Sequence, residues 1–346
     1  MKKTFLFIFS SLIGVGLFIA VLYYIGIEEV FSALKGFSWG TLIVVIGLGI
    51  LQIMVVVYRW QLVLKAQGDH VPYKKLFIPK LIGNAISFLT PGLYVGGEPV
   101  RAYVLKKNTG VRFTHGVASI IVDKILDFTY PMPFLISALV YAMLTFNVAW
   151  EVFSLFVAIL IILIVVLILF YIQTYRGKGF FSPILVLFRL NKIRYVKRLF
   201  EKVVYFENLV VEFFQKRKDI FFKGLLLSTL GGIIIFVQFA LLLNALGVDT
   251  NYWHIFIMMV FMILSFLIPI PASLGTFEAG QAIVFNALNY SPSAGVAFSF
   301  IFRIIEVLKA GVGLILLSNV GLSFLKGLND LATNGSHIPD KEIKKD

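Results

Sequence analysis

The stretch TPGLYVGGEPVRAY, Thr90 to Tyr103, decides how this chain folds. It places two prolines, three glycines, a carboxylate and an arginine inside a run of residues that is otherwise apolar. Proline and glycine are poor residues for a helix interior, so the stretch predicts a break between two helices. A helix that crosses a bilayer needs about 20 apolar residues. The apolar run from about Leu76 to Leu105 is therefore predicted to form two half-helices with Thr90–Gly97 as their turn.

The composition indicates an integral membrane protein. Hydrophobic residues make up 59% of the 346 residues, charged residues make up 14%, and the mean hydropathy is +0.93, far above that of a soluble domain. The net charge is +13. In a membrane protein such an excess of Lys and Arg usually lies in the cytoplasmic loops, so we expect no nucleic-acid partner. The chain has no cysteine, and its four histidines lack a ligand spacing. We therefore expect no metal and no other cofactor.

Basic residues predict which loops face the cytoplasm, because cytoplasmic loops carry an excess of Lys and Arg. Lys2 and Lys3 precede the first apolar run, which we interpret as an uncleaved membrane helix. The second run, Trp39 to Tyr58, is followed by basic residues that we assign to its cytoplasmic flank: Arg59, Lys65, Lys74, Lys75 and Lys80. More basic residues follow the opening stretch, so its two half-helices are predicted to enter and leave on the cytoplasmic side. Val248–Tyr252 has no cation and is predicted to lie outside.

A second stretch, PIPASLGTFEAG at Pro269–Gly280, has the same spacing as the first. A proline precedes a glutamate by seven residues in both, at Pro91 and Glu98 and at Pro271 and Glu278. The segments that follow also match, GVASIIVDKILD at Gly116–Asp127 with GVAFSFIFRIIE at Gly295–Glu306. This similarity predicts an internal repeat.

These observations predict an all-α polytopic membrane protein with about six full crossings and two re-entrant helical hairpins. One extra crossing separates the two halves, so the repeats, residues 1–147 and 150–325, are predicted to be inverted. Residues 1–325 are predicted to form a single transmembrane domain, in which 176–223 is a cytoplasmic amphipathic segment. Residues 326–346 form a short polar tail. Both termini are predicted to be cytoplasmic and the protein to lie in the cell membrane.

Ionisable residues within the apolar runs, and glycines at the helix breaks, are the candidate site residues. A charge near the bilayer centre costs about 3 kcal/mol or more, so such residues usually face the protein interior and mark a pathway. Backbone N–H groups at helix starts attract anions. The candidates for substrate binding are Gly96, Gly97, Glu98, Arg101, Lys124, Asp127, Gly275, Glu278, Arg303 and Glu306. We identify no catalytic residue.

Several of these candidates also have a purely structural interpretation. Lys124 and Asp127 lie three residues apart, as do Arg303 and Glu306, so each pair shares a helix face and can form a local ion pair. Asp123 and Lys309 lie nearer the ends of their predicted helices, where a long side chain can reach the membrane interface. The two hairpins can also be tightly packed bends that bind no ligand.

The motifs PGLYVGGEPVRAYVL, VDKILD and IPIPASLGTFEA resemble those of the lysylphosphatidylglycerol synthase transmembrane-region family. The resemblance extends from about residue 5 to 325, and it implies a module that moves an aminoacylated lipid to the outer leaflet. The family more often has Glu-Arg at the positions of Asp123 and Lys124, so a bidentate phosphate contact is not expected there. The tail after Leu325 is too short for a synthase domain, which implies that another protein makes the lipid.

The sequence favours a lipid transporter, or flippase, for a phospholipid or a polyprenyl-linked lipid, and no enzyme activity. The expected partners are that lipid, anionic head groups at the basic 176–223 segment, a lipid-modifying enzyme and a second copy of the chain. Three alternatives remain, namely an accessory subunit or scaffold, an intramembrane transferase, and a transporter of a soluble solute. No nucleotide-binding loop and no nucleophile with a neighbouring histidine supports an enzyme.

Overall fold

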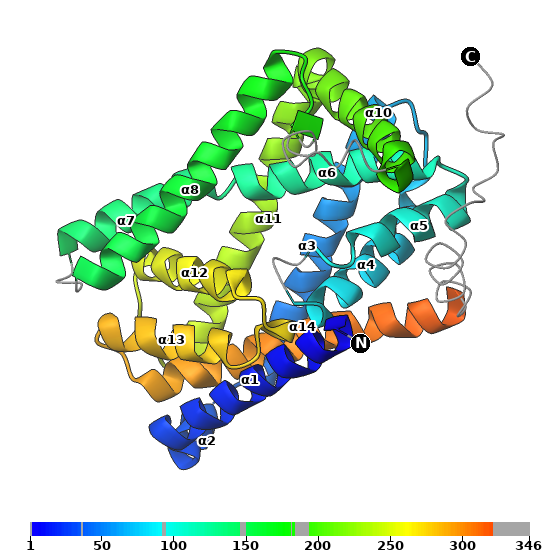
Figure 1. Ribbon diagram of the computed structural model, residues 1–346. Coiled ribbons are helices and arrows are strands. Elements are labelled where there is room, and N and C mark those ends of the chain that lie inside the picture. The colour runs from blue at the N-terminus through cyan, green and yellow to red at the C-terminus, as the bar shows by residue number, and fades with distance from the viewer. Residues whose placement is uncertain are drawn as a thin grey trace.

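The computed structural model describes residues 2–35, 37–91, 95–145, 150–180, 182–183 and 194–320. Every regular element in these ranges is a helix (Figure 1). The elements are α1 (Lys2–Ile25), α2 (Ile27–Leu34), α3 (Trp39–Ala66), η1 (Tyr73–Leu76), α4 (Phe77–Leu89), α5 (Glu98–Thr109), α6 (Phe113–Thr129), α7 (Met132–Thr145), α8 (Trp150–Tyr175), α10 (Arg194–Lys216), α11 (Lys218–Ala245), α12 (Tyr252–Leu267), η3 (Pro271–Ser273), α13 (Thr276–Ala287) and α14 (Pro292–Val320). The predicted tail 326–346 lies outside the described residues.

Four helical stretches of the described chain are long and apolar enough to cross a bilayer: Gly40–Ala66, Phe113–Thr145, Val157–Tyr175 and Lys218–Ala245. They confirm the prediction of an all-helical chain with several membrane crossings. Helix α14 has 29 residues, which is also long enough. It carries three charged residues within two turns, Arg303, Glu306 and Lys309.

The predicted helix breaks are both present. Helix α4 ends at Leu89, and α5 begins at Glu98 and packs against α4. Helix α12 ends at Leu267, and α13 begins at Thr276 after the short turn η3 and packs against α12. Proline and glycine thus interrupt the helices where the sequence predicted.

Helix α14 joins the two helix pairs into one structure. It packs against α4 of the first pair and α13 of the second, and Figure 1 shows it running past both. Helices α3 and α11 pack against each other along their length. A core of buried aromatic and aliphatic side chains, including Phe239, Phe285 and Phe298, fills the space between α11, α13 and α14.

Helix α10 lies in the predicted amphipathic segment, and its apolar face is covered by protein. Val210, Phe213 and Phe214 are buried in a cluster that includes Leu126 of α6 and Phe170 of α8. Burial of such side chains is worth about 1.5–3 kcal/mol each. This part of the apolar face is therefore used for packing onto α6 and α8 rather than for insertion into lipid.

Close packing of α4 and α5 depends on Gly97, and this gives a first prediction. A Cβ atom at Gly97 would collide with the backbone carbonyl of Gly83 and with the Ser87 hydroxyl. Replacing Gly97 by alanine should force the two helices apart and lower the free energy of unfolding by about 1–3 kcal/mol. The measurement is thermal unfolding in detergent. Gly231→Ala is the control, because a Cβ there meets nothing within 4 Å, and equal melting temperatures for the two variants would contradict the prediction.

Candidate functional site

Asp123 of α6 is the centre of a buried cluster of charges. Its side chain is 0% exposed. The Arg59 Nε donates to one carboxylate oxygen (2.8 Å), and the Arg101 Nη2 donates to the other (2.9 Å). A carboxylate this far from water needs such partners. Removing one partner of a buried ion pair typically costs about 3–5 kcal/mol, because a charge is left buried without compensation. The expectation that Asp123 can reach the membrane interface is therefore wrong.

Arg59 also corrects the sequence interpretation, which placed it on a cytoplasmic flank. It lies within α3, and its side chain is 1% exposed. Besides Asp123, it donates to the Asp127 carboxylate (2.6 Å) and to the Ser228 hydroxyl (2.6 Å). One guanidinium therefore ties together α3, α6 and α11. Helix α3 continues beyond the apolar run to Ala66, so Arg59 lies within the helix and in the protein interior.

Arg101 of α5 contacts an aromatic ring and two carboxylates. Its guanidinium lies 3.7 Å from the centroid of the Trp60 ring, a cation–π contact. Besides Asp123, it pairs with Glu98 at 3.4 Å, and Glu98 pairs in turn with Lys124 of α6 at 2.8 Å. The predicted substrate-binding residues Glu98, Arg101 and Lys124 are thus brought together with one another.

The residues of the predicted local ion pairs have other partners in the structure. Lys124 pairs with Glu98 of α5, and Asp127 pairs with Arg59 of α3, so both of these contacts join two helices. On α14, Arg303 pairs with Glu278 of α13, whereas Glu306 pairs with Lys309 at 2.7 Å, one turn further along the same helix. A local pair on one helix face is worth about 0.5 kcal/mol or less, so it competes weakly with contacts between helices.

The two glycines before α5, Gly96 and Gly97, allow close packing in this conformation. The Gly97 N–H donates to the Ser87 hydroxyl at 3.0 Å. A Cβ at Gly96 would collide with the Thr90 side chain. Both glycines therefore allow a compact turn, and the Gly97 N–H has a protein partner.

The second turn is held by Glu278 and Arg303. Glu278 is fully buried and accepts hydrogen bonds from the Gly275 N–H (2.8 Å) and the Arg303 Nε (2.6 Å). Arg303 also donates to the carbonyl oxygens of Ala272 (2.8 Å) and Ser273 (3.2 Å). These predicted site residues therefore form one unit that fixes the turn before α13.

Both helix pairs carry the same kind of contact. Glu98 at the start of α5 pairs with Lys124 on α6, and Glu278 near the start of α13 pairs with Arg303 on α14. In the sequence alignment of the two halves, these are matching positions. The first half also contains the buried charges Arg59, Arg101 and Asp123. The position that aligns with Asp123 in the second half is the apolar Phe302.

A cavity of about 220 Å³ lies between α3, α4, α6, α11, α12 and α14. Its charged lining consists of Lys80, Lys124, Asp127, Glu306 and Lys309. Apolar side chains, among them Phe88, Met262, Phe266 and Phe302, form other parts of the wall. Three of the ten predicted site residues, Lys124, Asp127 and Glu306, thus line one cavity, and Glu98 pairs with one of them. Gly275, Glu278 and Arg303 do not line it.

Comparison with known proteins identifies the family. Residues 7–313 match the family described as lysylphosphatidylglycerol synthase TM region. The chain belongs to this family. It is also similar to a UPF0104 membrane protein of Methanothermobacter thermautotrophicus, with 26% identity over 303 residues, 85% of this chain and 89% of the relative. A UPF0104 membrane protein of Pyrococcus horikoshii is 23% identical over 318 residues, 88% and 93% of the two chains.

The chain is thus a multi-pass integral membrane protein of the lysylphosphatidylglycerol synthase TM-region family. No solved structure matches it. The resemblance inferred from the helix-break motifs is confirmed over nearly the whole chain. Three residues of the charged cluster were not among the predicted site residues. Arg59 and Lys80 were counted as part of a basic flank, and Asp123 was placed near the end of its helix.

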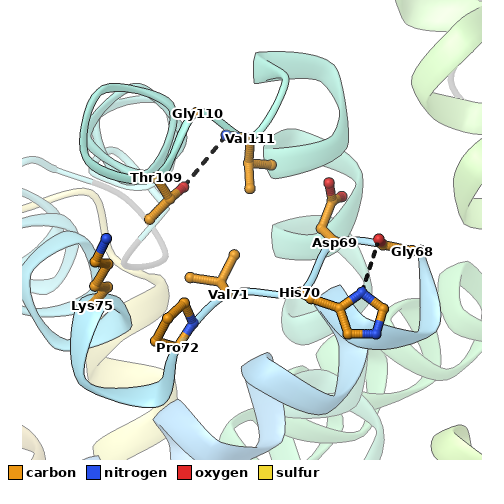
Figure 2. Close-up of a pocket in the computed structure, with 9 residues that line it drawn as sticks. All are labelled: Gly68, Asp69, His70, Val71, Pro72, Lys75, Thr109, Gly110 and Val111. Atoms are coloured by element: carbon orange, nitrogen blue, oxygen red, sulfur yellow. Dashed lines mark hydrogen bonds between the residues drawn. The ribbon is translucent and has the colours of Figure 1, made fainter.

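A second hollow, of about 240 Å³, lies where the α3–α4 connection meets the end of α5 (Figure 2). Several of its polar groups form hydrogen bonds within the loops that carry them. The Val111 N–H donates to the Thr109 hydroxyl (3.4 Å), and the His70 imidazole donates to the Gly68 carbonyl (3.3 Å). Asp69 accepts from the His115 imidazole at 2.8 Å. The interior cavity gathers more charges and more helices, so we take it as the candidate site of this family member.

Proposed function

We propose that this protein moves a phospholipid or polyprenyl-linked lipid between the leaflets of the membrane. The observation that carries the proposal is the cavity between the two helix pairs, where charged groups from α4, α6 and α14 meet apolar walls. The family name, which refers to the synthesis of a lipid, supports the same class of substrate. A lipid-modifying enzyme is the proposed source of that lipid.

A lipid head group is the part of the substrate that needs such a cavity. Its phosphate is charged, and a charge in hydrocarbon is unstable by many times the thermal energy. The cavity is smaller than the roughly 300–1,000 Å³ of pockets that enclose a whole drug-sized ligand. We therefore propose that only the head group enters the cavity and that the acyl chains stay in the surrounding lipid.

We further propose that the pairs α4–α5 and α12–α13 are re-entrant hairpins of an inverted repeat. Transporters of this kind place interrupted helices around a substrate site near the membrane midplane. Three observations support the proposal: both helix breaks, the matching Glu98–Lys124 and Glu278–Arg303 pairs, and the contact of α14 with both helix pairs. The two breaks thus provide the polar groups that a continuous apolar helix lacks.

This arrangement predicts the sidedness of two exposed loop positions. A cysteine that replaces Asp249, after α11, should react with an impermeant maleimide added to intact cells. A cysteine that replaces Lys178, after α8, should react only after the cells are opened. The cysteine-free chain provides the unlabelled control. Labelling of both variants in intact cells would contradict the proposed inverted arrangement.

Lipid movement is tested with purified protein in liposomes that contain a fluorescent phosphatidylglycerol reporter in both leaflets. An impermeant quencher destroys only the outer-leaflet fluorescence unless the reporter moves outward. We expect the protein to make the inner-leaflet reporter accessible, whereas protein-free liposomes retain their protected fraction. An encapsulated soluble dye controls for leaks, and an unchanged protected fraction with intact protein would refute the proposed function.

A further inference from the structure

Lys80 differs from every other cation around the cavity. It lies on α4, its side chain is 6% exposed, and it lines the cavity. Its ammonium is 3.8 Å from the Asp123 carboxylate, which is an ion-pair contact but too long for a hydrogen bond. No hydrogen bond joins this ammonium to any residue within the described ranges. A lysine ammonium has three donors, and all of them remain to be satisfied.

The other cations have partners that hold them. Asp123 accepts from Arg59 and Arg101 at 2.8 and 2.9 Å, whereas the Lys80 ammonium lies farther from it, at 3.8 Å. Lys124 is 2.8 Å from Glu98, and Lys309 is 2.7 Å from Glu306. A buried ammonium without a close partner costs several kcal/mol, of order 3–5 kcal/mol when a pair is broken. This cost is offset when an anion enters the cavity and binds Lys80.

The surroundings of Lys80 favour an anion over a cation. In the buried cluster, the four cations Arg59, Lys80, Arg101 and Lys124 outnumber the three carboxylates of Glu98, Asp123 and Asp127. Asn84 lies one turn beyond Lys80 on α4 and also lines the cavity. Its amide adds two N–H donors. An ammonium and a neutral amide on one helix face suit the several oxygens of a phosphate group.

We infer that Lys80, with Asn84, binds the phosphate of the transported head group. The inference rests on the proposed function for the lipid, but the anion site itself does not depend on transport. Arg59 and Arg101 do not touch this phosphate, because neither lines the cavity and both pair with the buried Asp123 carboxylate. They position α3, α5 and α6 so that Lys80 faces the cavity with its donors unused.

The first test is binding of inorganic phosphate to the protein in detergent. Phosphate should raise the melting temperature of the wild-type protein more than chloride does at the same ionic strength, because it binds the folded state. Lys80→Met should lose this shift. Lys178→Met, at an exposed position, should keep it. No phosphate-specific shift in the wild-type protein, or an equal shift in Lys80→Met, would overturn the inference.

Stability separates this role from a structural one. Lys80→Met removes a poorly paired buried charge, so its melting temperature without phosphate should equal or exceed that of the wild-type protein. If Lys80 instead served mainly as a counter-charge for Asp123, Lys80→Met would melt at a clearly lower temperature, and the inference would be wrong. Lys80→Arg keeps the charge and should retain part of the phosphate shift.

The second test uses two reporter lipids in liposomes, phosphatidylglycerol and a phosphate-free glycosyl diacylglycerol. Loss of charge-assisted hydrogen bonds should slow transport of phosphatidylglycerol by about tenfold or more in Lys80→Met, while any transport of the glycolipid is retained. Normal phosphatidylglycerol transport, or equal slowing of both lipids, contradicts the lipid assignment. Phosphate binding without any lipid movement by the wild-type protein would instead refute the proposed function and leave an anion site for free phosphate.

Discussion

Replacing Arg59 by methionine is expected to lower the free energy of unfolding by about 3–5 kcal/mol. The variant removes the hydrogen-bond donors that serve Asp123, Asp127 and Ser228 and leaves a negative charge in the interior with fewer partners. Because the arginine joins three helices, its loss should affect the whole helix bundle. Thermal unfolding in detergent, compared with the wild-type protein, measures the effect.

Two further variants show whether the lost charge pairing is the cause. Arg176→Met replaces an exposed arginine and should change stability by less than about 0.5 kcal/mol. Adding Asp123→Asn to Arg59→Met should cost less than the sum of the two single changes, because a neutral amide needs no counter-charge. Strictly additive effects would show that Arg59 and Asp123 do not stabilise each other.

Replacing Arg303 by lysine is expected to destabilise the protein by about 2–4 kcal/mol although the charge is retained. One ammonium cannot reproduce the planar fork that reaches the Glu278 carboxylate and the carbonyl oxygens of Ala272 and Ser273 together. A melting temperature close to that of the wild-type protein would show that charge alone suffices at this turn.

Backbone strain provides an independent check on the same turn. Ala272 and Ser273 have φ angles of +54° and +50°, which side chains disfavour. Ala272→Gly should relieve part of this strain and offset part of the loss caused by Arg303→Lys, by about 0.5–1 kcal/mol. If the glycine lowers stability further in the Arg303→Lys background, strain in the turn is not what Arg303 opposes.

The helix breaks could be predicted from the sequence because they follow from local chemistry. Proline is poorly tolerated in a helix interior, so Pro91 and Pro271 with glycines nearby predict breaks, and the structure has both. The family resemblance was predictable for the same reason, since its most specific motifs lie at these breaks. The inverted orientation of the two halves remains a prediction.

The charged cluster could be predicted only in part, because its pairs join residues far apart in the sequence. Arg59 and Asp123 are 64 residues apart, and no periodic pattern connects them. Counting Lys and Arg near the ends of apolar runs assigned Arg59 and Lys80 to a loop, since the count ignores how far a helix continues. Helix α3 is 28 residues long and carries Arg59 inside. Which cation stays poorly paired depends on packing and required the structure.

The central claim, that the lipid head group passes through the interior cavity, is tested most directly by blocking that cavity. Gln52→Cys places one reactive thiol in the cavity of this cysteine-free chain, and Ile233→Cys places one on the exposed side of α11 as the matched control. Both proteins are reconstituted, and movement of reporter phosphatidylglycerol is measured before and after attachment of a bulky thiol reagent. The account predicts that labelling reduces lipid movement by Gln52→Cys to the protein-free level and leaves Ile233→Cys unaffected. Undiminished lipid movement by fully labelled Gln52→Cys would contradict it.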